Sequence, residues 1–196
     1  KTEGFKSQYE KKGLLMLCQT EKMLEEEVKL AHLAKQEGLD VIEISRDDLK
    51  VLEPNVEIDA KGATYFKCDS HSTPGEFMEE MITYLKKVGV SFYPNEKVED
   101  LEVTNGKIRA IKTDKQRLIA DEFVLAAGSW SALLSKKLGL KLLLQAGKGY
   151  RINCTQNTGI SIPAILAEAK AAVTPMHGFT RFAGTMEIAG INHVIR

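Results

Sequence analysis

Residues 123–127 are apolar at every position and end at Gly128. A strand without polar residues is typical of a parallel sheet that helices cover on both faces. A helix predicted from residue 130 to 138 and closed by Gly139 follows directly. Because such a strand needs partner strands, the stretch predicts an α/β lobe around it.

The residues before this strand extend the lobe. Thr73 is the predicted N-cap of a helix over residues 74–88, with Pro74 at its first position and Glu76 three residues after the cap. A strand over 90–93 follows it. The pair Asn105-Gly106 predicts a tight hairpin between strands at 98–103 and 108–113, and residues 118–120 add a third strand.

The segments before and after this lobe have a different predicted order of helices and strands. Strands are predicted at 13–19, 41–44 and 62–66, with Thr20 capping a long helix and Ser45 and Asp48 opening a short one. After residue 140 only strands are predicted, at 142–154, 162–169, 171–174 and 179–188. The sequence therefore predicts an α+β protein with two domains, one of residues 1–73 and 139–196 and one of residues 74–138 inserted into it.

Composition excludes several functional classes. Lys plus Arg is 27 and Asp plus Glu is 27, so there is no basic excess to bind nucleic acid. The three cysteines form no C-x-x-C pair, and no spacing of histidines and acids predicts a metal site. We expect reduced thiols and, since no apolar run approaches the length of a membrane span, a cytoplasmic protein.

The turn after residue 127 is the predicted place for a cofactor. Ala126, Ala127 and Gly128 have small side chains, which let the backbone approach a bulky ligand closely. The helix that follows, with Ser129 and Ser131 as candidate caps, offers free N–H groups that suit a pyrophosphate. Any strand–turn–helix unit has small residues at its turn, however, so the pattern alone leaves a purely structural role open.

Residues 124–131 (VLAAGSWS) resemble the strand–turn–helix of the D-amino-acid oxidase superfamily of flavoproteins. Residues 148–150 (KGY) and 180–188 (TRFAGTMEI) resemble two further segments of bacterial D-amino-acid dehydrogenases. Glu53-Pro54 and Thr73-Pro74 fit the same order, so the resemblance runs from about residue 13 to residue 192.

The resemblance implies an incomplete FAD-binding lobe and a substrate-type domain with an antiparallel sheet. FAD is the implied cofactor, and an amino acid or amine the implied substrate. The matched cofactor positions are Val98, Ala126, Ala127, Gly128 and Trp130. The matched substrate positions are Lys148, Gly149 and Tyr150, while His71, in a polar loop before a helix, is a further candidate from its place in the sequence. The resemblance assigns no catalytic acid or base to this chain.

The sequence also departs from the family pattern. No G-x-G-x-x-G is present, and Arg181 does not match the arginines that clamp the substrate carboxylate. Ala172 stands where glycine oxidases carry a tyrosine, which favours the dehydrogenase-like branch. We therefore expect an internal fragment of an FAD-dependent enzyme, inactive alone, whose exposed sheet edge favours self-association.

Alternatives remain open at this stage. One alternative is an enzyme of the same family that acts on glycine, sarcosine or a 2-hydroxy acid. The other is a binding module that has no cofactor and is not an enzyme. The resemblance also leaves open contact with the inner face of the bacterial membrane.

Overall fold

The computed structural model describes residues 4–195 and consists of two compact units. Unit 1 comprises residues 1–88 and 149–185, and unit 2 comprises residues 89–148 and 186–196. Each unit is thus built from two separate stretches of the chain. The predicted domain boundaries, after residues 73 and 138, stay a prediction about the whole protein.

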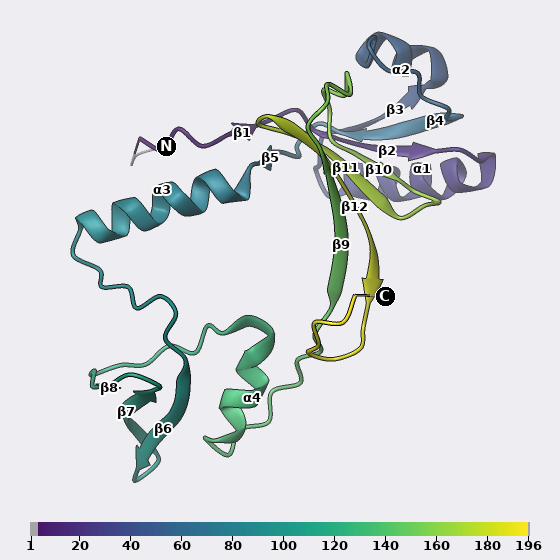
Figure 1. Ribbon diagram of the computed structural model, residues 1–196. Helices are drawn as coiled ribbons and strands as arrows, with labels where there is room; N and C mark the ends of the chain where they lie inside the picture. Colours follow the sequence, from purple (N-terminus) through teal and green to yellow (C-terminus); the bar gives the residue numbers. More distant parts are fainter. Residues whose placement is uncertain (1–3, 196) are drawn as a thin grey trace. The chain divides into compact units, whose positions relative to one another are not determined.

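A seven-stranded mixed sheet, in the order β3-β4-β2-β10-β11-β12-β9, forms the framework of unit 1 (Figure 1). Of its strand pairs, β2 and β10 run parallel, whereas β3–β4, β2–β4, β10–β11 and β11–β12 are antiparallel. The strands are β2 (Leu14–Cys18), β3 (Val41–Ser45), β4 (Gly62–Phe66), β9 (Lys148–Cys154), β10 (Ala164–Leu166), β11 (Ala171–Met176) and β12 (Phe179–Glu187). The prediction that segments from both ends of the chain share one sheet is confirmed.

Two helices pack on this sheet as the local sequence predicts. α1 (Glu21–Gln36) contacts β2, β3 and β4, and the Thr20 hydroxyl caps it by accepting the N–H of Met23. α2 (Arg46–Leu52) is capped in the same way by Ser45, which accepts the N–H of Asp48. The core beneath α2 contains the fully buried Leu15, Leu49 and Ala63.

The third helix, α3 (Pro74–Lys87), is present as predicted, but its predicted cap is wrong. Thr73 occupies the N-cap position without a side-chain cap bond. Its hydroxyl instead donates to the Gln8 Oε1 and accepts the N–H of His177. A partner 65 residues away competes successfully for the hydroxyl, and nothing in the local sequence signals it.

A segment near the N-terminus lies along α3. The short strand β1 (Tyr9–Glu10) pairs with β5 (His71–Ser72). Just before β1, Glu80 accepts the N–H groups of Lys6 and Ser7, both at 2.8 Å, and Glu76 accepts that of Gln8 at 2.9 Å. These backbone bonds are the main reason that the pKa values of Glu80 and Glu76 lie below their ordinary value of 4.5.

We expect acid to release this segment before the sheet unfolds. Because the folded pKa of each carboxyl is lowered, its contribution is fully present above pH 4.5 and is lost as the pH falls through the lower folded value. The amide signals of Lys6, Ser7 and Gln8 should move to unfolded positions as the pH falls from 4.5 through the lowered pKa values of the two carboxyls. NMR titration of the ¹⁵N-labelled chain measures this.

Two variants sharpen the titration. Glu80→Gln removes the negative charge and leaves one acceptor oxygen for the N–H groups of Lys6 and Ser7, so both amide signals should shift toward unfolded positions already at neutral pH. Glu79→Gln, an exposed neighbour on the same helix, is the matched control and should change neither signal. Amides that stay in place down to pH 3 in an otherwise folded chain would contradict the role of the two carboxylates.

Unit 2 contains a three-stranded antiparallel sheet, β6 (Val98–Thr104), β7 (Lys107–Thr113) and β8 (Arg117–Leu118). Asn105 and Gly106 join β6 to β7 with φ angles of 52° and 72°. Both angles are positive, as the tight hairpin turn requires, so this prediction is confirmed. The third strand, predicted over residues 118–120, is present only as the two-residue β8, which overlaps the prediction at Leu118.

Two predicted strands of unit 2 are absent from the described residues. Residues 90–93 and 123–127 form no strand, and Val124 is 90% exposed. An apolar strand is stable only when neighbours complete its hydrogen bonds and cover its side chains. No described strand pairs with either segment, so the prediction of a buried strand here is wrong for the chain as it stands.

Candidate functional site

The candidate cofactor turn lies at the start of a short helical segment of unit 2. A 3₁₀ turn, η1 (Gly128–Trp130), leads into α4 (Ser131–Lys136), which is shorter than the predicted helix. Neither element has a side-chain cap, so the predicted capping by Ser129 or Ser131 is wrong. Gly128 adopts a φ of +52°, a conformation that favours glycine.

The backbone at this turn is open. Apart from Gly128 itself and its two chain neighbours, no residue has a heavy atom within 4 Å of a Cβ built on Gly128. Ala126 is exposed, Ala127 is half-buried, and the Trp130 side chain is 52% exposed. Small side chains, a positive φ and free space fit the close approach of one part of a dinucleotide, although they do not enclose it.

Val98 belongs to the same unit and begins β6, half-buried and paired with Thr113. Next to it, Lys137 after α4 donates to the Glu99 carbonyl at 2.7 Å and pairs with Asp100 at 2.9 Å. Lys137 thereby ties the end of α4 to the start of β6. All five predicted cofactor residues thus lie in unit 2. Lys137 joins the two elements near which they lie, β6 and α4.

Lys148, a predicted substrate residue, is engaged with protein groups. Its Nζ lies 3.2 Å from the Glu187 carboxylate and also contacts Asn192 Oδ1 at 3.0 Å and the Val194 carbonyl. The Lys148 and Glu187 side chains are 25% and 15% exposed. This partly buried pair joins the start of β9 to the end of β12, so Lys148 has a structural partner for its charge.

The remaining substrate candidates lie in unit 1. Gly149 and Tyr150 follow Lys148 in β9, with Gly149 exposed and Tyr150 half-buried. His71, in β5, has a side chain only 7% exposed and 3.8 Å from Glu10. Burial lowers the pKa of His71, chiefly because the charged ring would lose its hydration. At neutral pH this histidine is therefore uncharged and surrounded by protein.

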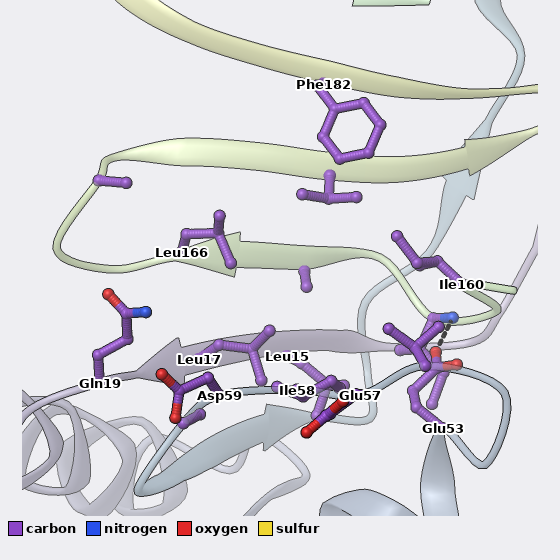
Figure 2. A pocket seen from close by; sticks show the side chains of 16 residues that line it. Leu15, Leu17, Gln19, Glu53, Glu57, Ile58, Asp59, Ile160, Leu166 and Phe182 are labelled. Atoms are coloured by element: carbon purple, nitrogen blue, oxygen red, sulfur yellow. Dashed lines mark hydrogen bonds between the residues drawn. The ribbon is translucent and has the colours of Figure 1, made fainter. Parts of the chain in front are cut away.

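An apolar cavity of about 260 Å³ also lies on one face of the unit 1 sheet (Figure 2). The strand registers place Leu15, Ala164, Val173 and Phe182 side by side across β2, β10, β11 and β12, which gives the cavity its floor. Figure 2 shows Leu17 and Leu166 beside this row and the Glu57 and Asp59 carboxylates among the lining residues.

One buried carboxylate borders the cavity. Glu53 is 2% exposed, and its two oxygens accept the Ser161 N–H, the Ser161 hydroxyl and the Ile162 N–H. These three donor groups bind both oxygens of the Glu53 carboxylate, so Glu53 fixes the 160–162 segment. The sequence singled out Glu53-Pro54 but gave no signal for partners more than 100 residues away.

A model of the family described as FAD dependent oxidoreductase matches residues 1–195. The chain belongs to this family. Within this family, the chain is 29% identical over 98% of its length to a D-amino acid dehydrogenase from Helicobacter pylori, strain ATCC 700392 / 26695. It is also 29% identical, over 93% of its length, to a D-amino acid dehydrogenase from Vibrio vulnificus. It spans about half the length of these relatives, 46% and 45%.

Solved structures show the same fold as this family member. A glycine oxidase from Bacillus cereus matches with a TM-score of 0.85 and 21% identity, covering 98% of this chain and 53% of that one. An L-proline dehydrogenase from P. horikoshii matches at 0.80 and 18%, covering 94% and 52%. The expected FAD-dependent family and fold class are therefore confirmed.

Proposed function

We propose that the protein containing this chain oxidises a D-amino acid with FAD as its cofactor. The observation that carries the proposal is the 29% identity to D-amino acid dehydrogenases along 98% of the chain. The family is FAD-dependent, and the open turn at Gly128 fits one part of that cofactor. When bound, FAD would supply the hydride acceptor for oxidation at the substrate Cα–H, which gives an imine that water hydrolyses to a 2-oxo acid and ammonia.

The residues of this chain have distinct proposed roles. Ala126, Ala127 and Gly128 let the cofactor approach the backbone, Val98 meets its adenine end through main-chain atoms, and Trp130 packs nearby. The exposure of Ala126 and Trp130 and the free space at Gly128 support these roles.

On the substrate side, β9 brings Gly149 and Tyr150 to the reacting part of the substrate. The ion pair of Lys148 with Glu187 then sets the position of β9 rather than leaving a free cation for the substrate. His71 contacts the substrate only as a neutral group, since burial lowers its pKa.

We also propose that the isolated 196-residue chain is inactive and self-associates. Among the strands that the structure describes, the outer strands β3 and β9 of the seven-stranded sheet have unpaired edges, and an exposed sheet edge favours pairing with another chain. We place the complete protein in the cytoplasm. Among residues 4–195, no helix is long and apolar enough to cross a bilayer.

The test is substrate oxidation by the complete gene product, measured with an artificial electron acceptor and by the 2-oxo acid formed. We expect D-alanine and other D-amino acids to be oxidised and the L-enantiomers to be poor substrates. A preference for glycine, sarcosine or a 2-hydroxy acid would replace the proposed substrate by the alternative within the family. A protein that neither binds flavin nor oxidises any of these would overturn the enzymatic proposal.

A further inference from the structure

Two arginines share one face of the unit 1 sheet. The Nε of Arg181, on β12, donates to the Asn153 Oδ1 on β9 at 3.1 Å. Because side chains alternate between the faces of a strand, Arg151, two positions before Asn153, lies on the same face. Burial lowers the pKa of the Arg181 guanidinium, and the positive charge of Arg151 lowers it further.

The orientation of Arg181 is fixed from two sides. Its guanidinium lies over the Phe179 ring, 5.3 Å from the ring centroid, an arrangement that stabilises a cation. Asn153 holds the Nε. The terminal nitrogens of the planar guanidinium remain available as donors, and their direction is set before any ligand arrives.

No acidic side chain of the described residues forms an ion pair with either arginine. Residues 148–187 contain only two acids, Glu168 and Glu187. Glu168 accepts the backbone N–H groups of Gln19 and Thr20, and Glu187 pairs with Lys148. Within the part of the chain that the structure describes, these two positive charges therefore have no carboxylate paired with them.

The neighbouring side chains on this face are small. Register pairs Arg181 with Thr174, and the next positions on the same face are the paired Ala172 and Ala183. Short side chains beside two long cationic ones leave room for a small anionic group at the sheet surface.

We propose that Arg151 and Arg181 bind a carboxylate group of a small molecule. A guanidinium presents two parallel N–H donors that match the two oxygens of a carboxylate. This carboxylate has two possible sources, an amino-acid substrate of the enzyme or a separate dicarboxylate that binds whether or not the enzyme oxidises amino acids.

Titration calorimetry of the complete gene product with glutarate at low ionic strength tests the site. We expect Arg151→Gln and Arg181→Gln to weaken glutarate binding roughly tenfold to hundredfold, as loss of a charged bidentate contact predicts. Arg181→Lys keeps the charge but loses the planar fork, so its affinity should fall in between. Arg109→Gln, the same charge change on an exposed arginine of β7, is the matched control and should bind as the unmodified protein does.

A second measurement identifies the source of the carboxylate. Competitive inhibition of amino-acid oxidation by glutarate would assign the site to the substrate, whereas unchanged oxidation at saturating glutarate would assign it to a separate ligand. Absence of glutarate binding, or equal affinity in Arg181→Gln and Arg109→Gln, would overturn the proposal. Glutarate binding is measured without turnover, so its result is independent of whether D-amino acids are substrates.

Discussion

The isolated 196-residue chain should leave gel filtration colourless after incubation with FAD, whereas the complete gene product should stay yellow. In dinucleotide-binding folds much of the affinity comes from the pyrophosphate on a glycine-rich turn and the following helix N-terminus. The chain contains no G-x-G-x-x-G. Its own candidate contacts, at Val98 and at the turn of residues 126–128, are open and engage only part of such a ligand.

The measurement is the ratio of flavin absorbance to protein absorbance in the eluted peak, followed by an assay with D-alanine. We expect the isolated chain to retain under a tenth of an equivalent of flavin and to show no turnover. The complete protein, purified in parallel, controls for the loss of FAD during chromatography. A stably yellow and active 196-residue chain would show that unit 2 holds the cofactor by contacts other than those described.

Glu53→Ala should lower the free energy of unfolding by about 3 kcal/mol or more, because it deletes several hydrogen bonds to one charged group. Glu53 is 2% exposed and accepts the N–H groups of Ser161 and Ile162. Without the carboxylate, these donors remain without acceptors beside an apolar cavity. Urea denaturation monitored by circular dichroism measures the change.

Matched variants separate the buried role of Glu53 from its charge. Glu53→Gln keeps one acceptor oxygen and should lose less stability than the alanine variant. Glu57→Ala removes an exposed carboxylate four residues along and should stay within about 0.5 kcal/mol of the original chain. Equal unfolding midpoints for Glu53→Ala and Glu57→Ala would contradict the anchoring role.

The sequence predicted well those elements whose causes are local. The Asn105-Gly106 turn needs two positive φ angles and has them, and the Ser45 cap needs only an N–H three residues ahead. Thr73 has an equally good local signal, yet its hydroxyl bonds to Gln8 and to the His177 N–H. A capping pattern cannot reveal a competing partner that is distant along the chain.

The candidate site was predictable to a similar extent. The resemblance selected Gly128, whose backbone is indeed open, and it selected Lys148 without indicating that Glu187 pairs with it. Hydrophobicity predicted a strand at residues 123–127, but strand formation depends on partners that no single segment encodes. Glu53 and the arginine pair on β9 and β12 depend on tertiary register, so their chemistry became visible only in the structure.

The parallel pairing of β2 with β10 has a consequence for biosynthesis. Leu15 and Ala164 are neighbours in the sheet, yet the ribosome makes the second of them on the order of ten seconds after the first, at about 5–20 residues per second. During this interval β2, with its apolar Leu15 and Leu17, has only β4 as a strand partner, and β3 lies on the far side of β4. The strand pairing of β6 with β7 extends only from Thr104↔Lys107 to Val98↔Thr113, so it is local in sequence and can form much earlier. Newly made chains are therefore most exposed to aggregation, and most dependent on chaperones, until the segment after residue 160 leaves the ribosome.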